Sequence, residues 1–219
     1  MIDLGTQIRP PQQQRSRASF ERVLEAATEL LRDEGYHGFT LAEVSRRAHV
    51  SIGSIYARVP SKDALFYTIH ERVMNRIADE SAVFSDPSRW ERLSTRRLVI
   101  EAVRELAAPF RAHTGILRVI MQRGAVDEVV ANRGSASLST LAEQFKAVLL
   151  TRRMDIMHPD PELAVDIAYR MAYCTVARRV MYGPTFESQR LVEWDDLVHQ
   201  LGVASAAYLL TDRAGAAHR

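Results

Sequence analysis

The sequence has little cysteine, proline and glycine, and each scarcity excludes a class of structure. Cys174 is the one cysteine among 219 residues, so no internal disulfide can form and a reducing compartment, the cytoplasm, is expected. Eight prolines and ten glycines gather at a few points, which disfavours a sandwich or barrel and favours long helices. No window approaches the roughly 18 uninterrupted apolar residues that a membrane span needs, and the N-terminal stretch lacks the character of a signal peptide. The sequence therefore predicts an all-α protein without a membrane segment.

Catalytic, metal-binding and phosphate-loop motifs are also missing. The chain has no glycine-rich phosphate loop, no paired-cysteine site and no HExxH zinc motif. His113 and His158 stand alone in the sequence, and nothing fixes the mutual geometry that a Ser-His-Asp triad requires. We therefore expect no enzymatic activity, no cofactor and no metal.

Lysine is nearly absent, since 27 of the 29 basic residues are arginine, and the net charge is only +2. The excess lies in residues 1–62, which hold 9 basic and 7 acidic groups, whereas residues 63–219 hold 20 of each. An N-terminal module that faces phosphate would have this distribution.

A compact pattern of helix caps lies between residues 40 and 62. Thr40 followed by Glu43 is a capping box that starts a helix with one apolar side. After a turn at residues 49–50, Ser51 caps a second helix that runs from Ile52 to about Arg58. A capped helix, a brief turn and a second short helix with basic residues nearby form the helix-turn-helix pattern.

Apolar residues at helical spacing predict seven further helices. These are expected at residues 16–34, 61–84, 88–113, 115–123, 126–155, 161–182 and 192–214. Gly35 is expected to end the first of them, Pro109 to kink or end the third, and Gly134 to mark a break. The polar residues 1–15 are expected to form a flexible arm.

A longer ordered string surrounds the helix-turn-helix pattern. It comprises Gly35, Phe39 and Thr40, then Ala48-x-Val50-Ser51, Gly53, Ile55-Tyr56 and Ser61-Lys62-x-x-Leu65. With this string, residues from about 16 to 75 resemble the N-terminal DNA-binding domain of TetR-family transcriptional regulators. The resemblance implies a helix-turn-helix domain at residues 16–70, joined by a long helix to a larger helical effector-binding and dimerisation domain at residues 71–219.

The sequence departs from the family pattern directly after Tyr56. Family members usually carry Tyr or His followed by Phe at this point, where this chain has Ala57-Arg58-Val59-Pro60. Arg58 in place of an aromatic residue changes the chemistry of the DNA surface. The base preference of the family therefore cannot be transferred to this chain.

The residues expected to bind DNA lie on or beside the two helices of the motif. They are Thr40, Arg46, Arg47, Ser51, Ile52, Ser54, Tyr56, Arg58 and Lys62. Ser54 can pair with a base edge, Ile52 can contact a thymine methyl, and Arg58 can pair with guanine or hold a phosphate. Ile55 is expected to point inward.

Other members of this set are expected to bind the DNA backbone. The resemblance implies phosphate contacts from the hydroxyls of Thr40 and Tyr56 and from Lys62. Thr40 is expected to combine this contact with its capping role. For Arg46 and Arg47, a solvated helix face is the alternative to a phosphate contact.

The last two predicted helices are strongly apolar. Their apolar residues are Leu163, Ile167, Met171, Cys174, Val176 and Val180 in one, and Leu197, Leu201, Ala204, Tyr208 and Leu209 in the other. This amount suits a helix-pair dimer interface, with monomer core as the alternative. The resemblance implies a homodimer that joins these helices in a four-helix bundle and presents two recognition helices to a palindromic operator.

Bulky and adaptable side chains are scattered over the middle helices, where the resemblance places an effector pocket. The expected ligand-binding residues are Trp90, Phe110, Leu117, Arg118, Met121, Phe145, Tyr169 and Tyr173. Arg118 and Tyr169 are the expected polar anchors. The mixture favours an apolar or aromatic effector, with or without a negative group.

The sequence thus predicts a ligand-responsive repressor that binds double-stranded DNA as a dimer and is released by a small molecule. In this hypothesis the effector shifts the predicted helix at residues 61–84 and changes the spacing of the recognition helices. One alternative is a helical small-molecule-binding protein or enzyme that retains the N-terminal fold without using it. Another is a DNA-binding protein without an effector, which would lack a cavity in its second domain.

Overall fold

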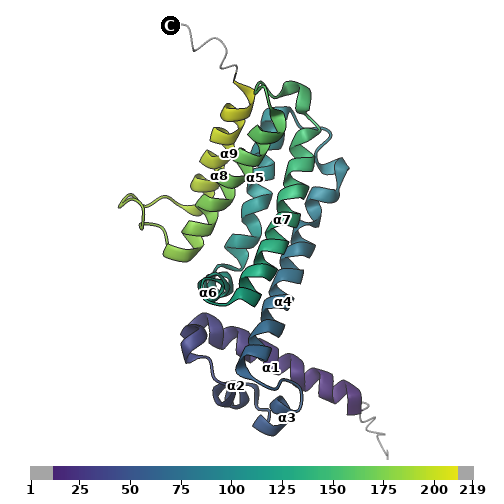
Figure 1. Cartoon of the computed structure of the whole chain (residues 1–219), viewed down its shortest axis with the longest axis vertical. Coiled ribbons are helices and arrows are strands. Elements are labelled where there is room, and N and C mark those ends of the chain that lie inside the picture. Colours follow the sequence, from purple (N-terminus) through teal and green to yellow (C-terminus); the bar gives the residue numbers. More distant parts are fainter. Residues whose placement is uncertain (1–11, 212–219) are drawn as a thin grey trace, which may run out of the picture. The chain divides into compact units, whose positions relative to one another are not determined.

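The computed structural model describes residues 12–211 of the chain, with the side chains of residues 16–211. Over this range the chain forms helices and no strand, which confirms the all-α prediction. It divides between Glu71 and Arg72 into two compact units, here called unit 1 (residues 12–71) and unit 2 (residues 72–211) (Figure 1).

Unit 1 is a small helical domain built around α1. Its helices are α1 (Gln12–Gly38), α2 (Leu41–Ala48), α3 (Ile52–Tyr56) and the first part of α4 (Lys62–Glu80). The apolar stripe predicted on α1 is buried from Val23 to Leu31, and α1 lies across α2 and α3 (Figure 1). Phe39 is fully buried, and Tyr36 meets the ring of Phe66 edge-on at 5.2 Å. The aromatic residues before α2 therefore pack in the core of unit 1.

Both ends of α1 differ slightly from the prediction. The helix begins at Gln12, four residues before the predicted start, because glutamine and arginine are good helix formers and can continue the helix back towards Pro11. Residues 1–11 of the predicted arm lie outside the described residues. Gly35 adopts φ 67° and interrupts the helix, as expected of a glycine at a helix end.

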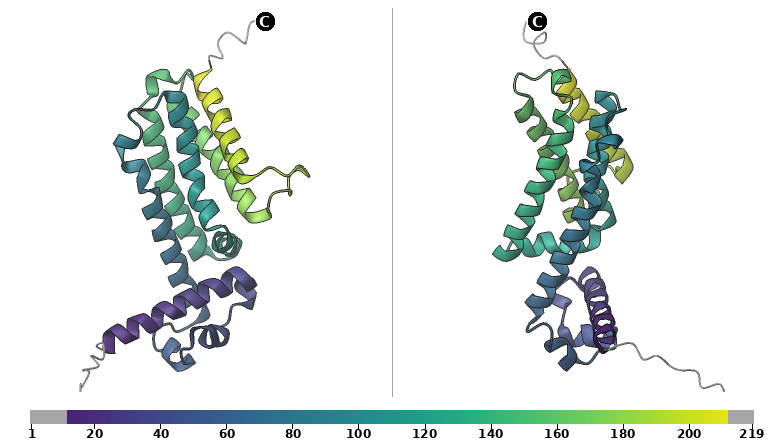
Figure 2. Two further views of the ribbon diagram at one scale, coloured as in Figure 1. Left: turned by 180° about the vertical axis from the view of Figure 1, so that it is seen from behind. Right: turned by 90° about the vertical axis from the view of Figure 1, so that its right-hand side faces the viewer.

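Unit 2 is a larger helical bundle. Its helices are the rest of α4, η1 (Ser81–Ser85), η2 (Pro87–Arg89), α5 (Thr95–Ala112), α6 (Thr114–Gly124), α7 (Glu128–Leu150), η3 (Arg153–Asp155), α8 (Pro161–Tyr182) and α9 (Trp194–Leu210). Helices α5, α7, α8 and α9 run side by side, and α6 runs across them (Figures 1 and 2). One continuous apolar core joins them, with Phe84 stacked on Trp90 at 5.7 Å and Phe145 against Phe84 at 6.1 Å.

Several predicted helix ends in unit 2 are wrong by a few residues, and caps explain two of them. Helix α5 begins at Thr95 rather than at residue 88, because Ser94 accepts a hydrogen bond from the Arg97 amide and fixes the start there. Helix α7 begins after Asp127, whose carboxylate accepts hydrogen bonds from two backbone amides of the first turn. The break predicted at Gly134 is also wrong, since α7 continues through it.

Close contact between α5 and α9 depends on one glycine. A Cβ atom at Gly202 would lie 3.0 Å from the Cα of Ile100 and 3.3 Å from its carbonyl oxygen. These are backbone atoms, which cannot move aside without shifting helix α5. The small residue therefore sets the distance between the two helices.

We predict that Gly202→Ala lowers the melting temperature of the protein. Overpacking costs typically about 1–3 kcal/mol, which exceeds the gain of about 1 kcal/mol in helix propensity. The matched control is Gly134→Ala, also within a helix, where an added Cβ would meet nothing within 4 Å. The control should gain about 1 kcal/mol, seen by circular dichroism as a melting temperature about 2–4 °C higher. An equal gain in both variants would contradict the close α5–α9 contact.

Candidate functional site

The first candidate site is the helix-turn-helix of unit 1, which local hydrogen bonds hold in shape. Thr40 Oγ1 accepts a hydrogen bond from the Glu43 amide at 3.2 Å, as the predicted cap requires. The turn is made by His49, which adopts the left-handed conformation with φ 51° and ψ 44°. Ser51 Oγ then accepts from the Ser54 amide at 3.2 Å and caps α3. The motif is therefore closed at both helix starts by a side chain.

Helix α3 turns nearly all of its side chains outward. Ile55 is 1% exposed, whereas Ile52 is 43% and Tyr56 is 52% exposed, and Ser51 and Ser54 are also exposed. The prediction that Ile55 points inward is confirmed. The outward face thus combines hydroxyl groups with one aliphatic side chain, which is a composition suited to base edges and phosphates.

Gly53 has no packing role in unit 1. A Cβ atom built there would meet nothing within 4 Å, and the residue has no positive φ. Glycine costs stability inside a helix, and no contact within the chain accounts for it. The missing side chain leaves the backbone of α3 open to close approach from outside.

The two arginines of α2 form an ion-pair network within unit 1. Arg46 Nη2 lies 2.6 Å from a Glu43 carboxylate oxygen, and Arg47 bridges Glu43 at 3.1 Å and Asp33 at 2.9 Å. Arg46 remains largely exposed, whereas Arg47 is more covered. The Glu43 carboxylate therefore pairs with these arginines. Of the predicted capping box, the hydrogen bond from the Glu43 amide to the Thr40 hydroxyl is formed.

Arg58 is held against the first helix. Its guanidinium lies over the ring of Phe20, 4.9 Å from the centroid, and donates a hydrogen bond to Ser16 Oγ. Arg58 is still exposed to solvent. Arg58 lies next to α3. If its guanidinium releases Ser16, this position allows either predicted role, base pairing or phosphate contact.

Lys62 opens α4 beside a pair of aromatic rings. Its Nζ lies 4.3 Å from the ring centroid of Tyr36 and 5.8 Å from that of Phe39. Ser61 Oγ accepts a hydrogen bond from the Ala64 amide at 3.1 Å and caps the same helix. The lysine charge therefore lies at a helix start, where free amides also attract anions.

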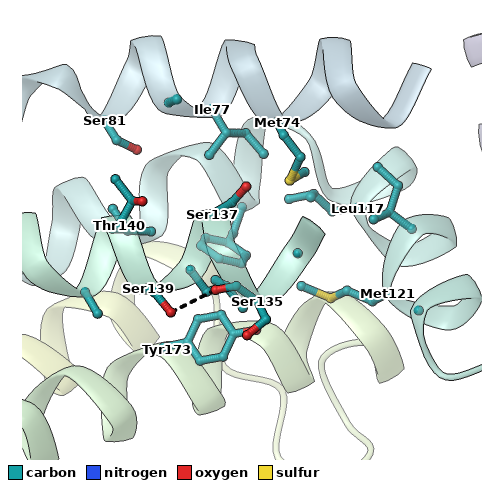
Figure 3. Close-up of a pocket in the computed structure, with 18 of the residues that line it drawn as sticks. Met74, Ile77, Ser81, Leu117, Met121, Ser135, Ser137, Ser139, Thr140 and Tyr173 are labelled. Carbon is teal, nitrogen blue, oxygen red and sulfur yellow. Dashed lines mark hydrogen bonds between the residues drawn. The ribbon is translucent and has the colours of Figure 1, made fainter. Parts of the chain in front are cut away.

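The second candidate site is a cavity of about 660 Å³ inside unit 2. Figure 3 shows side chains from α4, α6, α7 and α8 pointing into it. Its walls are mostly apolar, and they include the sulfur atoms of Met74 and Met121 and the ring of Tyr173. This volume and lining are typical of sites that bury a drug-sized ligand.

The structure brings together five of the eight residues predicted to bind a ligand. Phe110, Leu117, Met121, Tyr169 and Tyr173 all line the cavity. Tyr169 and Tyr173 stack on each other with ring centroids 6.0 Å apart, and Phe110 meets Tyr173 edge-on at 5.8 Å. Three of the five aromatic residues in the predicted pocket therefore form one continuous wall.

The other three predicted residues lie outside the cavity lining. Trp90 and Phe145 are buried in the core next to Phe84, and the Trp90 indole donates to the Val83 carbonyl at 3.1 Å. Arg118 donates to the Val180 carbonyl at 2.9 Å. Trp90 and Phe145 therefore fill the core, and Arg118 binds a backbone carbonyl.

Charged groups at the cavity are paired with one another. The Asp166 carboxylate lies 2.6 Å from Arg170 Nε and 3.6 Å from Lys146 Nζ. The hydrogen bond from Arg170 lowers the pKa of Asp166 below its usual value. Burial raises the pKa of both Tyr169 and Tyr173, so their phenols stay neutral at physiological pH.

Sequence reasoning missed the hydroxyl groups of the cavity. Those on α7 are Ser135, Ser137, Ser139 and Thr140, and Ser81 lies across the cavity at the start of η1. A run of small hydroxyl residues inside a long helix is a visible signal, because such residues are otherwise unfavourable there. Ser81 carried no such signal.

The apolar residues of α8 and α9 divide into two groups. Val176, Val180 and Leu209 are fully buried in the core of unit 2, so they do not belong to a free surface. Those that remain exposed or half-buried are Leu163, Ile167, Met171, Cys174, Leu197, Leu201, Ala204 and Tyr208. These eight residues are here called the α8–α9 face.

The described part of the chain contains neither a candidate metal site nor a candidate membrane span. No group of three or more His, Cys, Asp or Glu side chains within residues 12–211 could hold a metal ion. Within the same residues, every helix is too short or too polar to cross a membrane.

Together these features define a helical fold of two units with an N-terminal helix-turn-helix motif. Residues 23–69 match the sequence model of the bacterial regulatory proteins of the tetR family. The predicted resemblance to TetR-family transcriptional regulators is thereby confirmed for the N-terminal region. No curated protein matches the sequence.

Solved structures extend the similarity to the whole fold. A TetR-like transcriptional regulator from Rhodococcus sp. RHA1 is 22% identical, with 92% of this chain and 97% of that chain covered and a TM-score of 0.62. A protein from Mesorhizobium loti assigned to the TetR family is 19% identical over 89% and 96% of the two chains, with a TM-score of 0.65. A TetR transcription regulator from Haloarcula marismortui is 15% identical over 89% and 100%, with a TM-score of 0.68. The chain therefore has the fold of TetR-family transcriptional regulators.

We predict that the Glu43 carboxyl titrates far below an ordinary glutamate. Hydrogen bonds from Arg46 and Arg47 lower its pKa from 4.5 to about 2. Because the folded pKa lies below the unfolded value, this group stabilises the folded state above about pH 4.5, and the contribution is lost as the pH falls through about 2. Carboxyl carbon NMR titration of the folded protein measures the value directly. A midpoint near 4.5 would show that the network does not form in solution.

Proposed function

We propose that this protein is a ligand-responsive transcriptional repressor without enzymatic activity. It binds a palindromic operator in double-stranded DNA as a homodimer, in the cytoplasm, and leaves the operator when a small molecule occupies unit 2. The observation that carries the proposal is the outward face of α3, which exposes hydroxyls and Ile52 while Ile55 alone is buried. A helix presented in this way can enter the major groove and meet base edges.

The groups around α3 support a phosphate-binding frame. Thr40, Tyr56 and Arg46 are exposed, and Lys62 lies at the capped start of α4. Hydroxyls, basic side chains and helix starts are the groups that commonly bind phosphates and fix the register of a protein on DNA. We assign the phosphate contacts to these residues and base contacts to Ser54 and Ile52.

The cavity favours a regulator that is controlled by a ligand over a DNA-binding protein that has no effector. A DNA-binding protein that needs no effector would not require an internal space of about 660 Å³. The cavity wall includes Met74 and Ile77 of α4, and Lys62 begins the same helix. A ligand that displaces this wall acts on the helix that carries a phosphate-binding residue. Switching the population from 1:99 to 99:1 requires about 5.5 kcal/mol of differential binding.

The α8–α9 face supports the homodimer. Leu163 and Met171 remain exposed on α8 in the single chain, and Leu197, Leu201 and Tyr208 are only half-buried on α9. An apolar surface that spans two neighbouring helices is suited to a two-fold partner.

The proposal is tested by selecting duplexes from a randomised pool and titrating the winner with salt. We expect a palindrome for which the logarithm of the affinity falls steeply and linearly with the logarithm of the salt concentration. Gly53→Ala then tests direct contact: it should leave folding intact or slightly more stable and weaken operator binding about tenfold or more, because overpacking costs about 1–3 kcal/mol. Gly134→Ala, the control, should leave operator affinity unchanged. If no sequence is enriched and the protein does not bind DNA at low salt, the regulator proposal fails. The alternative to test is then a helical small-molecule-binding protein or enzyme.

A charge placed on the α8–α9 face should break the dimer. Met171 is 40% exposed on α8, and we predict that Met171→Glu gives a folded monomer by sedimentation equilibrium with unchanged helicity. Burying two carboxylates at a two-fold axis costs several kcal/mol. The control is Val126→Glu, since Val126 is more exposed and lies outside α8 and α9. If Met171→Glu stays dimeric, another surface makes the dimer.

A further inference from the structure

The cavity of unit 2 contains one buried hydroxyl that the protein leaves unsatisfied. Ser81 is only 3% exposed, and its Oγ has no hydrogen-bond partner among the described residues. The side chain lies at the cavity wall, across from Thr140 of α7 (Figure 3). Buried polar groups are nearly always hydrogen-bonded in folded proteins, so the unpaired Ser81 hydroxyl indicates a partner from outside the chain.

Four other hydroxyls at the cavity are already engaged within the chain, those of Ser137, Ser139, Thr140 and Tyr169. Ser137, Ser139 and Thr140 donate to backbone carbonyls one turn earlier in α7, at 3.0–3.2 Å. The Tyr169 phenol donates to the Leu138 carbonyl at 3.1 Å. Ser81 therefore differs from these four groups, because its hydrogen-bonding capacity is still available.

The charges at the cavity are also engaged, but with each other. Asp166 is paired with Arg170 at 2.6 Å and lies 3.6 Å from Lys146. A charged ligand would lose part of its hydration on entry, and the charged groups that could pair with it already neutralise each other. The arrangement therefore selects against anions and cations alike.

The remaining walls suit a flat or flexible apolar body. The stacked rings of Tyr169 and Tyr173 form one side, and Met74 and Met121 lie on the others. Methionine side chains adapt their shape to a ligand, and aromatic rings favour stacked or edge-on contact with another ring.

We propose that this cavity binds a neutral, mainly apolar small molecule that carries one hydroxyl or carbonyl oxygen, and that this oxygen pairs with Ser81 Oγ. The inference deepens the proposed function, since the molecule is the effector of the proposed regulator. It narrows the effector predicted from the sequence by excluding a negative group, because Arg118 is bound to the Val180 carbonyl and does not line the cavity.

Two matched series of compounds test the proposal in the full-length protein without DNA. One is flexible, with octylbenzene, 4-octylphenol and 4-octylbenzoate, and the other is rigid, with phenanthrene, 9-phenanthrol and phenanthrene-9-carboxylate. Calorimetric titration below any micelle concentration gives each affinity. In at least one series, we expect the neutral phenol to bind about tenfold or more tightly than both the hydrocarbon and the carboxylate.

Variants then locate the hydrogen bond. Ser81→Ala should weaken binding of the phenol about five- to tenfold and leave the hydrocarbon unchanged, whereas Ser137→Ala, which removes an engaged hydroxyl, should preserve the difference. Ser81→Ala removes an unpaired buried hydroxyl, so its melting temperature without ligand should be equal or higher. Tighter binding of the carboxylate, an unchanged phenol affinity in Ser81→Ala, or no binding in either series overturns the proposal.

DNA binding separates this inference from the proposed function. The selected operator is titrated with protein in the presence and absence of the tighter phenol. If the phenol binds through Ser81 but leaves operator affinity unchanged, the proposed class of ligand is supported and its role as effector is refuted. Loss of the ligand preference while operator binding persists would refute the ligand class alone.

Discussion

The burial of Ile55 is the contact on which the recognition surface depends. Helix α3 has five residues, and a helix this short is not stable in water without tertiary packing. The Ser51 cap and one fully buried side chain therefore fix its position against the core of unit 1. With a single inward residue, the neighbouring positions are free to vary in chemistry without loss of the fold. The exposed Ser54 and Tyr56 are two such positions.

The sequence predicted the features that local rules determine. The Thr40 and Ser51 caps and the inward Ile55 follow from cap chemistry and helical spacing, and all three are confirmed. What could not be predicted depends on partners far away in the chain. Arg58 packs on Phe20, thirty-eight positions earlier, and no local pattern indicates that contact.

The lining of the cavity likewise could not be predicted from local sequence patterns. An aromatic residue with helical spacing can line a cavity or fill a core, and the sequence does not distinguish the two. Phe110 and Tyr173 line the space, whereas Trp90 and Phe145 lie in the core against Phe84. The packing of the helices of unit 2 decides this division, and it also places Ser81, a residue without any sequence signal, at the cavity wall.

Features that the fold does not explain point to its partners. Gly202 is explained within the chain, because Ile100 occupies the space that a side chain would need. Gly53 has open space around it and still lacks a side chain, and the Ser81 hydroxyl is buried without a bond in the described residues. Each of these costs stability in the isolated chain, by about 1 kcal/mol for a helical glycine and about 1–3 kcal/mol for an unpaired hydroxyl. A surface that approaches α3 closely and a ligand oxygen at Ser81 would offset these two costs. DNA and a neutral small molecule satisfy both requirements, so the two unexplained residues, one in each unit, support the same proposed regulatory function.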